Sequence, residues 1–147
     1  MASKKLFDAW IRDVIRPDLD RVRRGIDARI DVNKRDRSDS SALDYAVRMG
    51  NLDIIKILID SKANPNRKDK KGNTPLHAAA TTGDPMIIVM LLNAKANVQQ
   101  KNDDRSTPLQ LAHSRKHKHI AELLMKAGAY LIAENKIGRG LDDSKRI

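Results

Sequence analysis

The sequence predicts an all-α solenoid of about four stacked helix–turn–helix units, joined by extended, β-hairpin-like fingers. The first observation is a self-similarity with a period of 33 residues. The aligned positions are Asp36, Asp69 and Asn102; Ser41, Thr74 and Thr107; Leu43, Leu76 and Leu109; and Ala46, Ala79 and Ala112. The second observation is that each period holds two short helical patterns. One of them is nearly all apolar, so it needs neighbours on both sides to be buried.

The third period shows the helix signals most clearly. In the run TPLHAAATTGD, Thr74 can cap a first helix, Pro75 suits its first turn and Gly83 ends it. Asp84 can cap a second helix, with Pro85 in its first turn, and the apolar run MIIVMLL follows. The small alanines allow the next unit to stack closely. We therefore expect one helix pair in each period.

The first and last units depart from the pattern. Leu6, Trp10 and Val14 form an apolar stripe at helical spacing in a first helix about one turn longer than the others. The many charges of this unit suit an N-terminal cap. We expect a repeat domain over residues 1–134, with repeats at about 4–35, 36–68, 69–101 and 102–134. Residues 135–147 are then a C-terminal tail or the start of a truncated fifth repeat.

Composition bounds the function. A chain of 147 residues suggests one domain, and the lack of cysteine excludes disulfides and thiolate metal sites. No apolar run approaches the roughly 18 residues of a membrane span, and no signal peptide is apparent, so we expect a cytoplasmic or nuclear protein. The net charge of +10 attracts acidic proteins, nucleic acid or anionic lipid. Aromatic residues make up only 3% of the chain, which argues against stacking platforms for single-stranded nucleic acid.

The run GNTPLHAAATTGD, followed by an apolar helix and an AN-V close, resembles an ankyrin repeat. The resemblance covers roughly residues 6–134. It implies a non-catalytic scaffold or adaptor whose fingers and first helices line a concave groove for a protein partner. The implied contact positions on the fingers are Arg37, Ser38 and Ser40; Lys70, Lys71 and Asn73; and Asp103, Asp104 and Ser106. Those at the helix ends are Arg48 and Met49; Thr81 and Thr82; and Ser114 and Arg115, and the finger-closing positions are Arg35, Lys68 and Lys101.

These positions carry a charge gradient. The first two fingers are strongly basic, whereas the third carries Asp103 and Asp104. We therefore expect an acidic partner segment across the first two fingers, with Met49 beside Arg48 as an apolar anchor. The alternatives are lysines that only solvate the fingers, binding of nucleic acid or anionic lipid, a structural module for self-association or spacing, and one segment of a larger multidomain protein. We expect a monomer.

The histidines are interpreted as scaffold rather than as chemistry. The resemblance implies that His77 bridges backbone groups of neighbouring loops, and the other units place Asp44 and Gln110 at its position. His113 should end one helix and His117 should begin the next, among lysines and arginines that repel a cation, so we expect no metal there. No phosphate-binding glycine loop and no nucleophile–base set can be assembled. The sequence therefore predicts no enzyme and no cofactor.

Two kinds of turn lack the glycine that the family favours. After the second helices the residues are Arg29, Lys62 and Lys95, with glycine only at Gly128. In the fingers, Asp39 and Arg105 stand where the third unit has Gly72. A side chain in a left-handed turn costs roughly 1 kcal/mol, so these positions predict local strain.

Overall fold

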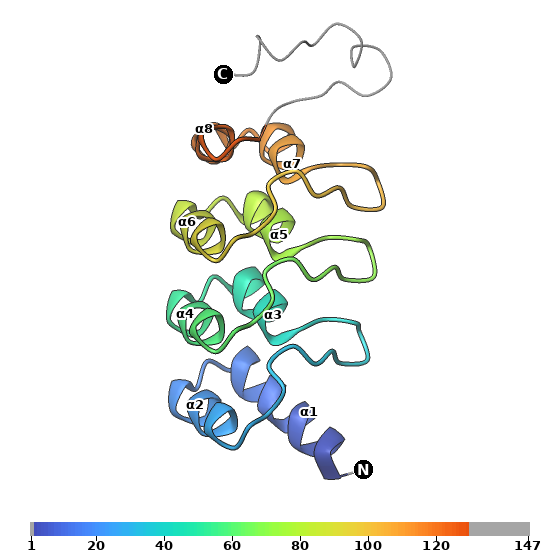
Figure 1. Ribbon diagram of the computed structural model, residues 1–147, viewed down its shortest axis with the longest axis vertical. Helices are drawn as coiled ribbons and strands as arrows, with labels where there is room; N and C mark the ends of the chain where they lie inside the picture. Colours follow the sequence, from blue (N-terminus) through green and yellow to red (C-terminus); the bar gives the residue numbers. More distant parts are fainter. Residues whose placement is uncertain (1, 130–147) are drawn as a thin grey trace, which may run out of the picture.

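The computed structural model describes residues 2–129, and in that range it forms a stack of four helix pairs (Figure 1). The helices are α1 (Ala2–Ile15), α2 (Leu19–Asp27), α3 (Ala42–Met49), α4 (Leu52–Asp60), α5 (Pro75–Thr82), α6 (Pro85–Asn93), α7 (Pro108–Ser114) and α8 (Lys118–Lys126). The first helices of the pairs form one column and the second helices form another, and the loops project on the side of the first column. No strand occurs in residues 2–129, which confirms the all-α prediction. Residues 135–147, expected to form a tail or the start of a truncated fifth repeat, lie outside the described residues.

The second helices keep the 33-residue period without error. Their N-caps are Asp18, Asn51, Asp84 and His117, and each helix has nine residues. The side chains of the first three caps accept a backbone N–H of the first turn at 2.9 to 3.0 Å. Such a bond satisfies one of the donors that a helix start leaves unpaired. The predicted cap at Asp84 is thereby confirmed.

Three of the first helices, α3, α5 and α7, begin with a reciprocal cap. The backbone N–H of the N-cap residue donates to the side chain three residues on: Ser41 to Asp44 at 2.8 Å, Thr74 to His77 at 3.1 Å, and Thr107 to Gln110 at 2.8 Å. Three different side chains therefore perform one structural task.

These helices end differently. α3 and α5 end at Gly50 and Gly83 with φ of 71° and 81°, whereas Lys116 occupies the same register after α7 with φ of 60°. This third left-handed lysine was not predicted from the sequence.

The alanines and leucines of the period form the core. Leu43, Leu76 and Leu109 are at most 1% exposed, and Ala46 and Ala79 are fully buried. Contacts run from α3 to α5, from α5 to α7 and from α4 to α6, so each pair is covered by its neighbours. Burying a leucine side chain stabilises the fold by about 1.5–3 kcal/mol, which the stack provides once per repeat.

The predicted stripe on α1 is partly wrong. α1 is longer than expected, with 14 residues against seven or eight in the other first helices. Trp10 and Val14 are buried as predicted, but Leu6 is 56% exposed. Phe7 and Ile11 take the inner face instead, at 2% and 4% exposure. Leu6 instead lies at an open pocket between α1 and α2.

The fingers are hairpin-like loops, here defined as finger 1 (residues 34–40), finger 2 (67–73) and finger 3 (100–106). Each is closed by one backbone hydrogen bond: Asp36 N–H to Ser40, Asp69 N–H to Asn73, and residue 102 to 106, at 2.9 to 3.0 Å. The turn of each finger contains one left-handed residue.

The predicted left-handed turns are confirmed. In the fingers, Asp39, Gly72 and Arg105 have φ of 59°, 73° and 62°. At the corners after α2, α4 and α6, the φ angles of Arg29, Lys62 and Lys95 are 60°, 68° and 70°.

An asparagine ladder ties these corners together. The side chain of Asn33 donates to the carbonyl of Lys62 at 3.1 Å and accepts the N–H of Asn64 at 2.7 Å. Asn66 repeats the first contact on Lys95 at 3.1 Å. Consecutive repeats are thus joined by backbone-directed bonds as well as by apolar packing.

Candidate functional site

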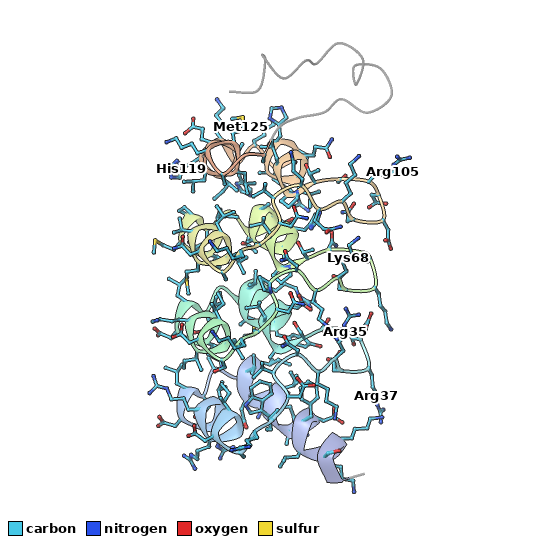
Figure 2. All side chains as sticks on the ribbon, in the orientation of Figure 1. Arg35, Arg37, Lys68, Arg105, His119 and Met125 are labelled. Carbon is cyan, nitrogen blue, oxygen red and sulfur yellow. The ribbon has the colours of Figure 1, made fainter. Side chains whose placement is uncertain are left out.

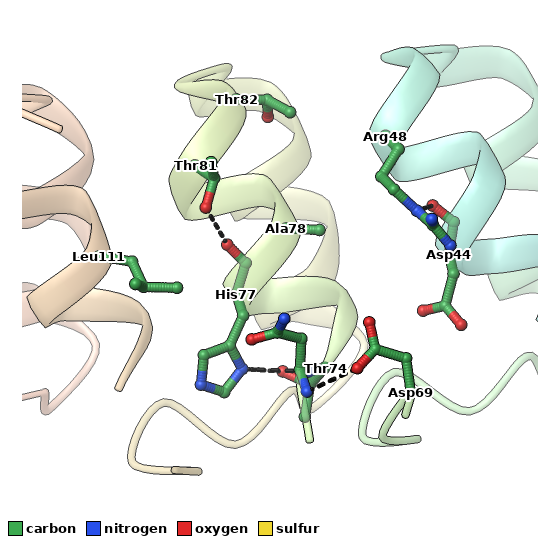
Figure 3. Close-up of a pocket in the computed structure, with 10 residues that line it drawn as sticks. Asp44, Arg48, Asp69, Thr74, His77, Ala78, Thr81, Thr82 and Leu111 are labelled. Atoms are coloured by element: carbon green, nitrogen blue, oxygen red, sulfur yellow. Dashed lines mark hydrogen bonds between the residues drawn. The ribbon is translucent and has the colours of Figure 1, made fainter. Parts of the chain in front are cut away.

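A hollow of about 220 Å³ opens beside the first helices, between α3, α5 and α7 (Figure 3). Four of the predicted contact residues line it: Arg48, Asn73, Thr81 and Thr82. They come from α3, finger 2 and α5, so the stacking of two repeats brings them together. The remaining predicted contact residues do not line this hollow.

Arg48 is held in place at this hollow. Its Nε donates to the carbonyl of Asp44 at 3.2 Å, and its Nη2 donates to Ser40 Oγ at 2.9 Å. Its guanidinium also lies 5.0 Å from the centre of the Tyr45 ring, a cation–π contact. A side chain ordered in this way loses less conformational entropy when a partner binds.

The predicted contact role of Ser40 does not fit the structure. Ser40 was predicted to contact a partner, but it is only 4% exposed and its hydroxyl accepts from Arg48. It supports Arg48 instead of presenting a surface of its own.

Tyr45 was not predicted, although its hydroxyl donates to the Asp36 carboxylate and so ties α3 to finger 1. Burial, and then the bond to Asp36, raise the pKa of Tyr45. Its position follows an ordinary helical pattern, so the sequence carried no signal for this role.

The inner wall of the hollow carries Asp44 and Asp69. Asp44 is 6% exposed, and burial raises the pKa of its carboxyl group despite the hydrogen bond from Ser41. Asp69 also acts against the charged form of Asp44. Thr81 and Thr82 donate their hydroxyl protons to carbonyls of their own helix at 3.0 Å. This wall therefore suits a small side chain that donates a hydrogen bond.

His77 is a structural residue. It is fully buried, its Nδ1 accepts the Thr74 N–H at 3.1 Å, and its Nε2 lies 2.9 Å from the Ser106 carbonyl. Because Nδ1 must accept, the proton of the neutral ring sits on Nε2 and is donated to finger 3. Burial lowers the pKa of His77, in keeping with a neutral ring. The predicted bridge between neighbouring loops is confirmed.

His117 makes a second bridge, which was not predicted from the sequence. It is the residue before α8, and its Nε2 lies 3.1 Å from the carbonyl of Thr81 in the preceding repeat. A Cβ on Gly83 would come within 2.8 Å of its ring, so glycine makes room for it. His113 is exposed in the last turn of α7. In residues 2–129 no three metal-binding side chains form a group, and no helix there is long and apolar enough to cross a membrane.

The finger residues present mostly cations. Arg37, Lys68, Lys70 and Lys71 are exposed, and Figure 2 shows Arg35 and Lys68 one repeat apart on the finger side. Lys70 Nζ donates to the carbonyl of Arg37 at 3.2 Å, which links finger 2 to finger 1.

The other predicted contact positions differ in exposure. Met49, at the end of α3, is 47% exposed. Ser38, Asp103, Asp104, Ser114 and Arg115 are exposed, whereas Lys101 and Ser106 are half-buried.

Stacked helix pairs with projecting fingers define a helical repeat solenoid, a class that presents an extended surface and not an enclosed active site. Residues 61–135 match the family model for ankyrin repeats in three copies, and residues 11–59 match one for ankyrin repeats in many copies. The chain belongs to the ankyrin repeat family. A comparison with curated proteins found no match. Ankyrin repeats are generally modules for protein–protein interaction and are typically non-catalytic.

Proposed function

We propose that the chain is an adaptor that binds an acidic segment of a partner protein across the hollow and the first two fingers. The observation that carries the proposal is the ordered Arg48 at the hollow. The exposed cations of fingers 1 and 2 add positive charge to the same side of the molecule. A positioned guanidinium forms two parallel hydrogen bonds with a carboxylate more readily than a flexible lysine does.

The anchor and the charges have different tasks. Met49 offers an exposed, adaptable apolar surface next to Arg48, and such anchors contribute most of the affinity. Exposed ion pairs contribute about 0.2–1 kcal/mol each, so the lysines act mainly on partner choice and association rate. Within the hollow, Asp44 and Asp69 favour a donor such as a hydroxyl or amide. The expected segment therefore places one small donor side chain in the hollow, flanked by carboxylates that reach the fingers.

The test is a pull-down from native cell extract at moderate salt, read by mass spectrometry. One bait is the wild-type chain, and another carries Arg48, Met49, Lys70 and Lys71 changed to alanine. The matched control has Lys56, Met86, Lys118 and Lys126 changed to alanine, which removes the same number of charges and one methionine from the exposed side of α4, α6 and α8. We expect a partner that the wild type and the control retain and the groove variant loses. If all three baits retain the same proteins, the hollow and fingers are not the binding site.

A further inference from the structure

We propose that the partner segment has a fixed polarity: its carboxylates lie on fingers 1 and 2, and a lysine or arginine lies on the tip of finger 3. This inference rests on the proposed function and specifies the segment that the same surface accepts. The supporting observation is that some charged side chains of each finger bond within their own loop, whereas others lie at the surface.

The carboxylates of fingers 1 and 2 are used inside their own loops. Asp36 accepts the backbone N–H groups of Ser38 and Ser40 at 2.8 and 3.1 Å. Asp69 accepts the equivalent two N–H groups, each at 2.9 Å. The third carboxylate, Asp39, pairs with Arg35 at 2.8 Å. These groups therefore stabilise the loops and add little negative charge to the outer surface.

Four cations of the same two fingers are exposed to solvent. Arg37 in finger 1 is exposed, as are Lys68, Lys70 and Lys71 in finger 2. The outer surface of the first two fingers is therefore basic, because its exposed charged residues are all cations.

Finger 3 reverses this arrangement. Its loop-closing position holds the neutral Asn102, which accepts the N–H of Ser106 at 2.9 Å. Its two carboxylates, Asp103 and Asp104, stand instead at the exposed tip. They occupy the register of Lys70 and Lys71, 33 residues earlier. The tip charge therefore changes sign between finger 2 and finger 3, although Lys101 and Arg105 keep finger 3 neutral in total.

The two tips are fixed against each other. The N–H of Asp103 donates to the carbonyl of Lys71 at 3.0 Å. The Asp103 carboxylate lies over Gly72, where a Cβ would come within 2.5 Å of Oδ1. The basic tip and the acidic tip are thus direct neighbours in a set order, which is the requirement for reading the polarity of a ligand.

Repeat geometry gives the spacing of the matching charges. Neighbouring helices pack about 8–10 Å apart, and an extended chain advances about 3.3 Å per residue. Each finger therefore meets every third residue of an extended segment. The matching pattern is Glu-x-x-Glu-x-x-Lys. One of the residues between the charged positions can then place its side chain in the hollow.

Charge complementarity favours a protein over a nucleic acid here. A nucleic acid carries one sign of charge along its backbone, so its phosphates would meet Asp103 and Asp104 at finger 3. A polypeptide can place a cation there. The acidic tip would repel a uniform polyanion and attract a segment of mixed sign.

The test compares three synthetic peptides by NMR titration of the ¹⁵N-labelled chain at an ionic strength of about 20 mM, where screening is weak. The matched peptide carries Glu-x-x-Glu-x-x-Lys, the scrambled peptide Glu-x-x-Lys-x-x-Glu, and the uniform peptide three glutamates, all with Gly and Ser between. We expect the wild type to bind the matched peptide about threefold or more tighter than the scrambled one. The amide shifts should centre on fingers 2 and 3.

Two charge variants separate position from net charge. Asp103→Lys with Asp104→Lys should reverse the order, so that the uniform peptide binds tighter than the matched one. Asp53→Lys with Asp60→Lys changes the net charge equally from exposed positions on α4, and should keep the wild-type order. Circular dichroism melts confirm that each variant is folded before titration.

Three outcomes would overturn the inference. Equal affinity for matched and scrambled peptides would remove the polarity. If no peptide binds while the groove variant still loses its partner from extract, the polarity is wrong and the proposed function stands. A single-stranded oligonucleotide that binds tighter than the matched peptide would assign the basic fingers to nucleic acid instead.

Discussion

At the scale of single residues, the main energetic feature is a set of side chains in left-handed turns. In residues 2–129, six residues other than glycine have φ between 59° and 70°: Arg29, Asp39, Lys62, Lys95, Arg105 and Lys116. Each costs roughly 1 kcal/mol because its Cβ crowds the following carbonyl. The asparagine ladder holds two of these corners, since the carbonyls of Lys62 and Lys95 accept its bonds.

Replacing one such residue by glycine should stabilise the protein. Lys95→Gly relieves the strain at φ of 70° without removing the backbone bond to Asn66. We expect a gain of about 0.5–1 kcal/mol and a melting temperature higher by about 2–4 °C, after allowing for the greater freedom of glycine in the unfolded chain. Thermal melts followed by circular dichroism measure this change.

The matched control is Gly128→Ala at the equivalent corner. Gly128 has φ of 99°, and a Cβ there would meet no atom within 4 Å, so any loss reports backbone strain alone. Its melting temperature should fall. A fall for Lys95→Gly would show that the lysine side chain contributes more than its turn costs.

Stability should also depend on pH through His77. In the unfolded chain its imidazole takes up a proton near pH 6.5, whereas burial lowers its pKa in the folded protein. A lowered folded pKa means that the unfolded state binds more protons below pH 6.5. The contribution of His77 is therefore complete above that pH and is lost as the pH falls toward the folded pKa.

The variant His77→Gln isolates this titration. Gln110 shows that glutamine can accept the N-cap N–H at the same register, here from Thr107. The variant should lose about 1 kcal/mol at pH 7.5, because the bond to Ser106 is weakened, but its stability should fall less between pH 7.5 and 5.5. Urea unfolding at three pH values measures the difference. Parallel curves for the two proteins would mean that His77 does not titrate in this range.

At the scale of elements, the first helix pair depends on one close contact. The indole of Trp10 donates to the carbonyl of Val22 at 3.0 Å and packs on Gly25 of α2. A Cβ on Gly25 would lie 2.1 Å from the Trp10 ring. α1 packs on α2 and on α3, and this contact fixes how closely it approaches α2.

Gly25→Ala should therefore separate α1 from α2. Overpacking of this kind costs about 1–3 kcal/mol. Hydrogen exchange should rise in the first repeat, while α5 and α7 keep their protection, because a solenoid unfolds in local units. Adding Trp10→Leu to the same chain should restore part of the stability by making space. Uniform loss of protection along the chain would contradict local unfolding.

At the scale of the whole molecule, the stack turns local differences between repeats into one continuous surface. The same register holds Lys70 and Asp103, and the same cap is built from Asp44, His77 and Gln110. The core residues repeat while the finger residues vary, so the fold is constant and the charge is not. The binding specificity proposed above is a property of this sequence of tips and not of any single repeat.

The sequence alone determined the helix pair of each period and five of the six left-handed turns that carry a side chain. These features depend on hydrogen bonds and steric limits within about four residues, as at Thr74 and Asp84, so a one-dimensional pattern contains them.

Only the tertiary structure decided which residues meet across repeats. It placed Phe7 inward in place of Leu6 and hid Ser40 beneath Arg48. These outcomes depend on how each unit rotates against the next, and hence on contacts some 30 residues apart, such as His77 with Ser106. The rotation between units results from the packing of all the stacked side chains together. The spacing of residues along one repeat therefore cannot predict it.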